Sequence, residues 1–290
     1  MPAFYRIAVA FDGSENSLEA CSAAARLARG RGTAVDVVTV APALRGSGDE
    51  KDQSRKKAMK MMDEGCASIS KEGVPVRRRV IETHGSVVDA LVKYSSDKKC
   101  DLIVVGARGS GGLRRLLLGS VSSGVVTHAS MPVLVARDLP SREGQLFGRV
   151  LVAVDGSESS EEAVGVAARV AKSTGAVLTI IHVIYIPAAV YSSGSPSAAG
   201  IEKEARKKAE EYLSRAKESA EKAGMDSKVR IVEDLQSPVR GITDYALKMG
   251  VDLIVLGTRG LGGFKRLLVG SVASGVVNYA HCSVLVVRGG

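Results

Sequence analysis

The chain repeats itself, and this internal repeat constrains the fold more than any other feature of the sequence. Residues 6–15, RIAVAFDGSE, return at 149–158 as RVLVAVDGSE. Residues 101–106, DLIVVG, return at 252–257 as DLIVLG. Self-similarity at a fixed spacing indicates a duplicated structural unit. The chain is therefore expected to contain two copies of one domain.

Each copy alternates short apolar runs with helical patterns. The runs are too short and too continuously apolar for half-buried strands, and they indicate strands covered on both faces. We expect strands at 7–11, 35–40, 76–81, 102–105 and 133–136, and at 150–154, 177–183, 228–232, 253–256 and 284–287. Helices are expected to begin near 14, 157, 120 and 271 and to cover 56–69, 87–94, 201–223 and 239–247.

This alternation predicts an α/β fold, with two tandem open twisted parallel five-stranded sheets that carry helices on both faces. Sheets of this kind bind ligands at the carboxyl ends of their strands, where the strand order reverses. Asp12 and Asp155 end the first strand of each copy, and Gly106 and Gly257 end the fourth. If the first and fourth strands are neighbours, these residues line one crevice in each copy.

The segment 139–147 contains proline, serine and glycine without apolar periodicity, and we interpret it as a linker between domains at 1–138 and 148–290. The stretch 187–200 is rich in Ser, Gly, Ala and Pro, which favours a mobile loop inside the second copy. The charged segment 202–222 is expected to form a solvated helix face with i,i+4 ion pairs.

Composition limits the setting and the partners. The N-terminal residues resemble no signal peptide and no apolar run is long enough for a membrane helix, so we expect a cytoplasmic protein without a membrane partner. The four scattered cysteines are expected to be reduced. A formal charge of +9 favours anionic partners. Because the basic residues are dispersed and aromatics make up only 4%, nucleic acid is not expected.

A glycine-rich loop follows the fourth strand of each copy. The pattern is Gly106-x-x-Gly109, nine residues, then Gly119-Ser120, and it returns as Gly257-x-x-Gly260, nine residues, then Gly270-Ser271. Converging backbone amides can form an anion-binding nest, and the serines are placed to cap the next helix. Neither copy has the P-loop lysine or a dinucleotide G-x-G-x-x-G. Glycines that only shape tight turns are the alternative.

These residues resemble the universal stress protein family, through the Asp-Gly-Ser after the first strand, the glycine spacing and the Leu-Leu-x-Gly-Ser-Val run. The resemblance covers both halves, as in tandem members, and the glycines match the nucleotide-binding branch. It implies one ATP or AMP per copy, with Mg²⁺ accompanying the phosphates and no metal site made by the protein. The implied contacts are Asp12, Val40, Gly106, Gly109, Gly119, Ser120 and Val121, with Asp155, Val183, Gly257, Gly260, Gly270, Ser271 and Val272. It also implies an internal pseudo-dimer through the fifth strands, and further homodimerisation stays open.

Several residues have two interpretations. Arg108 and Arg259 lie within the loops, where they would neutralise phosphate or point into solvent. Asp12 and Asp155 would face the ligand or cap the following helix. No histidine recurs between the copies, so no catalytic residue is assigned. The function expected is a nucleotide-binding regulator of the stress response, and the alternatives are a slow ATPase and a scaffold with vestigial sites.

Overall fold

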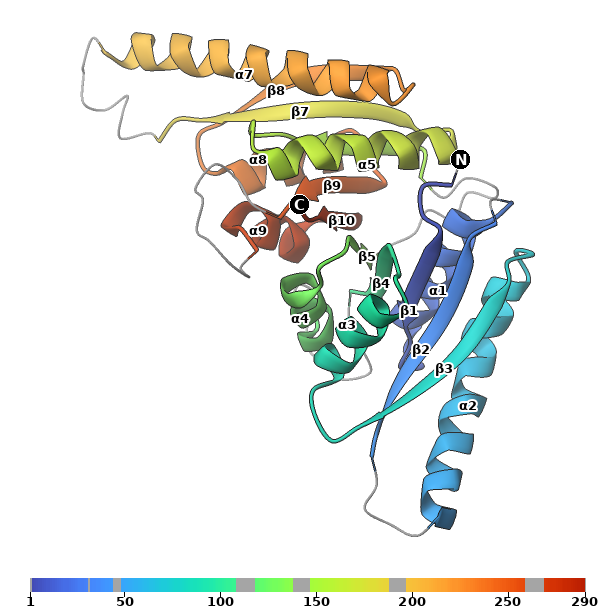
Figure 1. Ribbon diagram of the computed structural model, residues 1–290. Coiled ribbons are helices and arrows are strands. Elements are labelled where there is room, and N and C mark those ends of the chain that lie inside the picture. Colours follow the sequence, from blue (N-terminus) through green and yellow to red (C-terminus); the bar gives the residue numbers. More distant parts are fainter. Residues whose placement is uncertain are drawn as a thin grey trace. The chain divides into compact units, whose positions relative to one another are not determined.

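The chain divides into two compact units, Met1–Leu146 and Phe147–Gly290. The computed structural model describes residues 2–30, 32–43, 48–107, 118–137, 147–187, 197–258 and 269–289. Residues 139–146 of the expected linker and most of the loop expected at 187–200 lie outside these ranges, whereas Phe147 is described and buried. Each unit is a parallel α/β domain and is described by itself (Figure 1).

The first unit alternates strands and helices along its whole length. Its elements are β1 (Arg6–Ala10), α1 (Glu15–Ala28), β2 (Ala34–Pro42), α2 (Gly48–Ser70), β3 (Val76–Thr83), α3 (Val87–Asp97), β4 (Leu102–Gly106), α4 (Ser120–His128) and β5 (Val133–Ala136). The second unit repeats the order with β6 (Arg149–Ala153), α5 (Glu158–Thr174), β7 (Val177–Tyr185), α7 (Ser197–Lys222), β8 (Ser227–Asp234), α8 (Pro238–Lys248), β9 (Leu253–Gly257), α9 (Ser271–Tyr279) and β10 (Ser283–Val287).

Both sheets are parallel and five-stranded, as the sequence predicted. The strand order is β3-β2-β1-β4-β5 in the first unit and β8-β7-β6-β9-β10 in the second. The order reverses beside the first strand of each unit, because β1 pairs with both β2 and β4, and β6 pairs with both β7 and β9. A crevice at the carboxyl ends of these strands is the expected ligand site of such a sheet.

Helices cover both faces of each sheet. In the first unit α1 packs beside α2 and α3 packs beside α4, and in the second unit the pairs are α5 with α7 and α8 with α9. The two pairs lie on opposite faces of the sheet. Asp36 of β2 points to the face of α3, where it accepts a hydrogen bond from Tyr94. Thr39 is three residues further along β2 and so points to the other face, where it donates to the carbonyl of Phe11. The strands β4, β5 and β10 are buried along their whole length.

The first helix of each unit begins where the sequence predicted, and for a local reason. The Ser14 hydroxyl accepts a hydrogen bond from the amide of Ser17, and Ser157 does the same for Ser160. A side-chain acceptor at this position satisfies one of the amides that the helix leaves unpaired at its start. The alanines of α1 are buried, so this helix can approach the sheet closely.

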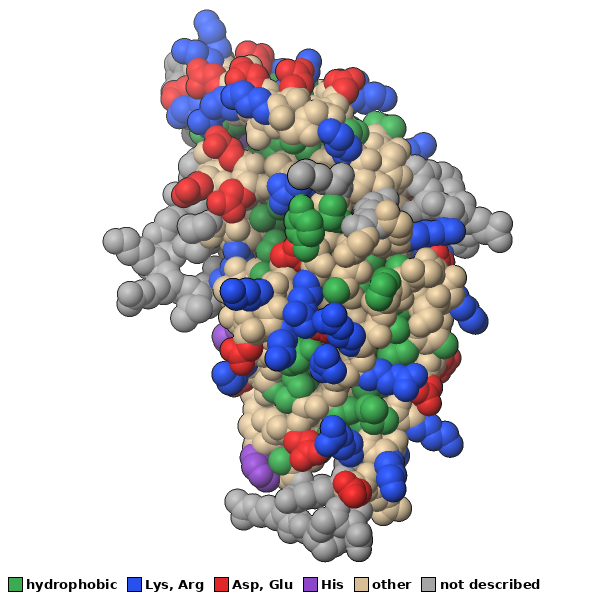
Figure 2. All heavy atoms as spheres, turned by 45° about the vertical axis from the view of Figure 1, so that its right-hand side comes forward, with side chains coloured by type: hydrophobic (Ala, Val, Ile, Leu, Met, Phe, Trp, Pro, Cys, Tyr) green, Lys and Arg blue, Asp and Glu red, His purple; other side chains and the backbone are tan. Residues whose placement is uncertain are grey.

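The charged helix α7 has the solvated face expected from its sequence. Acidic and basic side chains alternate along it at the top of the view in Figure 2. Two of its i,i+4 ion pairs are Lys208–Glu204 and Lys217–Glu221. No helix in the described part of the chain has both the length and the apolar character needed to cross a membrane.

Candidate functional site

The residues singled out by the sequence gather at the carboxyl edge of each sheet. Val9 of β1 lies opposite Val104 of β4, so Asp12 and the end of β4 emerge from the sheet together. The amide of Phe11 donates to the carbonyl of Val38, which brings Val40 level with Asp12 on the neighbouring strand. The strand pairing in the second unit is the same, with Ala153 opposite Leu256.

The Asp-Gly-Ser turn is built identically in the two units. Asp12 Oδ1 accepts from the amide of Ser14 at 3.1 Å and from its hydroxyl at 2.6 Å. Asp155 and Ser157 repeat both distances, at 3.1 Å and 2.6 Å. The serine, not the aspartate, is the N-cap of the helix. The helix-capping alternative for the aspartates is therefore wrong; each carboxylate orients the serine that does the capping.

The glycine of this turn is required by its conformation and by its neighbours. Gly13 has φ +80° and Gly156 has φ +82°, a region that side chains rarely adopt. A Cβ on Gly156 would lie 2.4 Å from the ring of Tyr212 on α7, and one on Gly13 would lie 3.0 Å from Met61 on α2. The second long helix of each unit thus lies directly against the turn.

Gly106 and Gly257 have a packing role that the sequence did not reveal. A Cβ on Gly106 would lie 2.4 Å from the carbonyl oxygen of Asn16 in α1. A Cβ on Gly257 would lie 2.5 Å from the hydroxyl oxygen of Ser159 and 2.6 Å from its carbonyl carbon in α5. Each glycine lets the first helix of its unit cross close to the end of the fourth strand. The close approach explains these two glycines whether or not a ligand is bound.

The two ends of each glycine-rich loop are tied together at this edge. The amide of Gly119 donates to the carbonyl of Ala107 at 2.9 Å, and the amide of Gly270 donates to that of Thr258 at 2.7 Å. Arg108, Gly109, Arg259 and Gly260 lie outside the described residues. Their role in the site therefore stays a prediction from the sequence.

The helix that follows each loop begins without a side-chain cap. Its N-cap is Gly119 in α4 and Gly270 in α9, with ψ of 153° and 154°. The prediction that Ser120 and Ser271 are N-caps is therefore wrong by one residue: each is the first residue of its helix, and each is exposed. Since glycine offers no oxygen for the first-turn amides, those amides face the carboxyl edge as donors for an external anion.

The four valines occupy different parts of this edge. Val40 and Val183 lie in β2 and β7, and Val183 turns toward α8, since a Cβ on Gly241 would meet it at 2.8 Å. Val121 and Val272 are the second residues of α4 and α9 and are half-buried. Val121 and Val272 thus bring apolar surface to the first turns of α4 and α9.

Two hydroxyl groups distinguish the copies, and sequence reasoning missed both. The Ser122 hydroxyl donates to the carbonyl of Gly106 at 2.6 Å, whereas the second unit has Ala273 there. The second unit instead has Thr258 where the first has Ala107. The Thr258 hydroxyl is buried and has no hydrogen-bond partner within the described part of the chain. These exchanges were visible as mismatches inside the repeat.

Comparison with known proteins explains the duplication. The universal stress protein family model matches residues 3–137 and again 146–288. The chain belongs to the universal stress protein family. A universal stress protein of Mycolicibacterium smegmatis is 33% identical over 217 residues, covering 71% of each chain. One of Methanocaldococcus jannaschii is 34% identical over 148 residues, which are 51% of this chain and 86% of the relative.

A solved structure shares the fold over the full length of this universal stress protein. The crystal structure of a universal stress protein from Archaeoglobus fulgidus has a TM-score of 0.72, covers 98% of both chains and is 24% identical. The tandem architecture expected from the sequence is thereby confirmed. Membership of the family supports a role in the stress response.

His182 and two cysteines of this universal stress protein lie in structural contacts. His182 Nδ1 lies 2.7 Å from the carbonyl of Val154, and its ring meets Tyr212 edge-on. Thr39 makes the equivalent bond to Phe11 in the first unit, so the histidine replaces a core threonine. Burial raises the pKa of Cys21 to about 12 and that of Cys100 to about 11. Within the described residues, no group of three or more His, Cys, Asp or Glu could hold a metal.

Proposed function

We propose that each unit binds one adenine nucleotide, ATP or AMP, at the carboxyl edge of its sheet, and that the protein regulates the stress response through this binding. The observation that carries the proposal is the repeated arrangement at that edge. In both units a glycine tied to the end of the fourth strand starts an uncapped helix, beside the aspartate that ends the first strand.

The first turn of α4 or α9 would hold the phosphates. Its amides donate hydrogen bonds, and the helix dipole places about half a positive charge there. The hydroxyls of Ser120 and Ser271 add one donor in each unit, and both are exposed at the helix start. In the second unit the hydroxyl of Thr258, which has no partner among the described residues, is a further potential donor at the same edge.

The strand ends would hold the rest of the nucleotide. Among the described residues, Oδ1 of Asp155 accepts the two hydrogen bonds of the turn, from the amide and the hydroxyl of Ser157. The other oxygen is suited to accept from a ribose hydroxyl or an adenine amine. Val40 and Val183, on the neighbouring strands, would give the base an apolar surface. Mg²⁺ would be held through the phosphates when it accompanies them.

Binding is preferred to hydrolysis as the function. The sequence lacks the Ser-Gly-Gly-x-Asp-Ser loop of ATP-pyrophosphatase relatives after its first strand, and hydrolysis needs a base that orients water. Phosphate release from ATP by the full chain is expected to stay at background. Turnover that Asp12→Ala combined with Asp155→Ala abolishes would contradict this choice.

The test adds a charge at each helix start without weakening the helix. Ser120→Asp and Ser271→Asp place a carboxylate where the helix dipole favours it, but where it repels phosphate. Charges about 4 Å apart in solvent repel by about 1 kcal/mol or more, so affinity should fall about fivefold or more for each unit. Calorimetric titration of the full chain with ATP and with AMP, with and without Mg²⁺, measures this.

Ser214→Asp is the matched control, because it adds the same charge on the exposed face of α7. It should leave nucleotide affinity unchanged. Nucleotide binding to the folded protein also raises its melting temperature. A nucleotide concentration one hundred times Kd stabilises the folded protein by about 2.7 kcal/mol. If the melting temperature of the wild-type protein does not rise with millimolar ATP or AMP, the proposal is wrong.

A further inference from the structure

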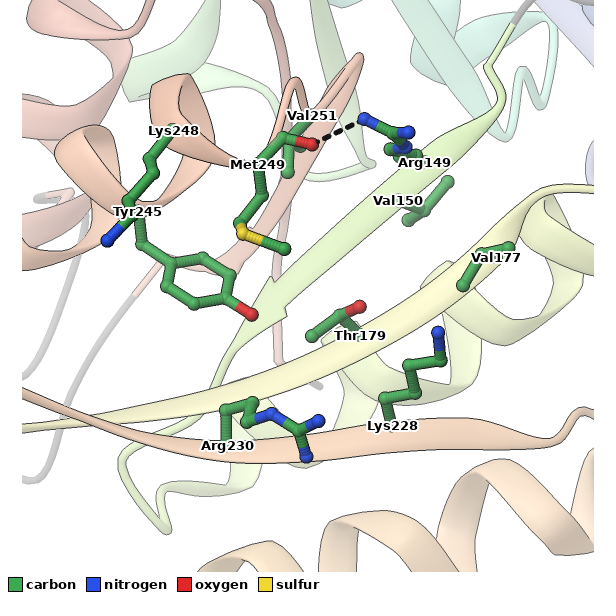
Figure 3. Close-up of a pocket in the computed structure, with 10 residues that line it drawn as sticks. All are labelled: Arg149, Val150, Val177, Thr179, Lys228, Arg230, Tyr245, Lys248, Met249 and Val251. Atoms are coloured by element: carbon green, nitrogen blue, oxygen red, sulfur yellow. Dashed lines mark hydrogen bonds between the residues drawn. The ribbon is translucent and has the colours of Figure 1, made fainter.

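The second unit contains a pocket of about 440 Å³ at the amino-terminal end of its sheet. Arg149 and Val177 are the first residues of β6 and β7, and Lys228 is the second residue of β8. Helix α8 covers the pocket with Tyr245, whose hydroxyl points toward Thr179 in Figure 3. The pocket is therefore at the opposite end of the strands from Asp155 and Ser271.

The first unit shows what fills this position when an acid is present. Asp36 of β2 is fully buried and accepts from Arg6 Nη2 at 2.7 Å and Nε at 3.1 Å. The Tyr94 hydroxyl of α3 donates to the same oxygen at 3.0 Å. Arg6 and Tyr94 thus both donate to the carboxylate of Asp36, through Nε and Nη2 of the arginine and the hydroxyl of the tyrosine.

The second unit keeps the arginine and the tyrosine but has lost the acid. Arg6 pairs with Ala34 and Arg149 with Val177, so Thr179 stands where the first unit has Asp36. Arg149 Nη1 donates instead to the carbonyl of Met249 at 2.7 Å (Figure 3). Lys248 also replaces an acid, Asp97, which pairs with Lys93 in the first unit.

The exchanges leave an uncompensated cluster of positive charge. Four of the ten residues that line the pocket are cationic and none is acidic: Arg149, Lys228, Arg230 and Lys248. The ten matching positions of the first unit hold four cations and two acids. Carboxylates of adjoining segments are engaged elsewhere, Asp244 by Arg240 Nε and Asp252 by the amides of Gly148 and Arg149.

We propose that this pocket binds a small, multiply charged anion carrying phosphate groups, and that only the second unit does so. The volume suits a small ligand. Arginine presents a planar fork of donors to phosphate, and lysine adds compact charge. The hydroxyls of Tyr245 and Thr179 supply neutral donors beside them. The ligand takes the place of the carboxylate that the first unit carries in its own chain. This site is independent of the nucleotide sites at the carboxyl edge.

The first test uses inorganic pyrophosphate as the probe, with calorimetric titration and thermal unfolding of the full chain. Lys228→Gln combined with Arg230→Gln removes two exposed cations and should weaken pyrophosphate binding tenfold or more. Lys203→Gln removes an exposed cation on α7 and should change affinity less than twofold. Equal losses in both variants would mean diffuse attraction and overturn the proposal.

The second test restores the acid of the first unit. Thr179→Asp should bring Arg149 and Tyr245 onto the new carboxylate and abolish pyrophosphate binding. The Lys228 and Arg230 variant keeps the proposal testable if Thr179→Asp does not fold.

Ser271→Asp, at the other end of the strands, should leave pyrophosphate binding intact. Loss of pyrophosphate binding in Ser271→Asp would assign that binding to the nucleotide site instead. If the wild-type protein does not bind millimolar pyrophosphate, the proposed anion site is wrong. Duplex DNA that binds through the same four cations without pyrophosphate binding would also overturn it.

Discussion

Gly106 lies so close to α1 that a Cβ on it would be 2.4 Å from the carbonyl oxygen of Asn16. This contact gives the first glycine of the loop pattern a reason that needs no ligand. The evidence for a nucleotide site therefore rests on the later part of the pattern, on Gly119 with its bond to Ala107 and on the uncapped start of α4.

Gly106→Ala and Gly257→Ala are each expected to destabilise the protein by about 1–3 kcal/mol, because overpacking forces the helix and the strand apart. Thermal unfolding measures the effect. Gly165→Ala, inside α5, is the control: its Cβ would have only Arg169 Nη1 near, at 3.8 Å. It should stabilise the protein by about 0.5–1 kcal/mol through helix propensity. Equal behaviour of the three variants would contradict the packing argument.

Thr258→Ala is expected to raise the stability of the nucleotide-free protein. The Thr258 hydroxyl has no partner among the described residues, and a buried donor left unpaired costs about 1–3 kcal/mol. The first unit already has alanine at this position, Ala107. An increase of about 1 kcal/mol should be measurable as a rise in melting temperature. In the presence of saturating ATP the gain should shrink if the hydroxyl donates to the nucleotide. A loss of stability without nucleotide would show that the hydroxyl is satisfied in solution.

Asp12→Asn together with Asp155→Asn separates the turn from the ligand. Asparagine keeps the acceptor oxygen that binds Ser14 or Ser157 but removes the charge. The melting temperature should stay close to that of the wild type, while nucleotide affinity falls several-fold. Ser14→Ala is the contrasting variant, since loss of the N-cap costs about 1 kcal/mol. If affinity for ATP and AMP is unchanged in the double variant, the aspartates serve the turn alone.

Asp36→Thr should destabilise the first unit strongly. Removing one partner of a buried ion pair costs about 3–5 kcal/mol, and we expect the lower part of that range because the Arg6 side chain keeps 26% exposure. Asp97→Asn breaks the exposed pair with Lys93 and should cost less than about 1 kcal/mol. Urea unfolding compares the two. Similar losses would mean that burial of Asp36 adds nothing.

The buried thiols should resist alkylation while the protein is folded. Burial raises the pKa of Cys21 to about 12 and that of Cys100 to about 11, so both stay protonated at pH 8 and are shielded from iodoacetamide. Because the folded pKa lies above the unfolded one, their stabilising contribution is complete below about pH 9. It falls as the pH rises toward 11–12. The measurement is mass spectrometry of protein treated briefly with iodoacetamide. Alkylation of Cys21 or Cys100 in the folded protein at pH 8 would contradict the prediction.

The repeat and the apolar runs were sufficient to predict the α/β class and the parallel sheets. That the first and fourth strands are neighbours was only a condition for the expected crevice, and the structure supplies it. The predicted boundaries of a helix were less accurate where its first residues are not buried. Helix α2 begins at Gly48, whereas the sequence predicted a start at residue 56. Its first residues carry no apolar periodicity, and its buried face begins at Ala58 and continues through Met62 and Ile69. A periodic signal appears only where a face is buried.

The candidate site was predicted as a set of residues but not as a set of roles. The sequence places Gly106 and Gly119 in one pattern, yet the first lies against a helix and the second begins one. Contacts between segments far apart in the sequence decide such roles, and the spacing of glycines along the chain does not reveal these contacts. The pocket beside Arg149 was missed for the same reason: its signal is two positions, Thr179 and Lys248, at which the first copy has an acid.

Arg6 and Arg149 occupy the same register in two copies of one domain. Arg6 is paired with Asp36, whereas Arg149 donates to the carbonyl of Met249 and has no acid among the described residues that line its pocket. Identity at an aligned position therefore does not carry a role from one half of a tandem protein to the other. At this register the first unit holds an acid, Asp36, and the second holds Thr179. Any transfer of residue roles from single-domain relatives has to be made separately for each half.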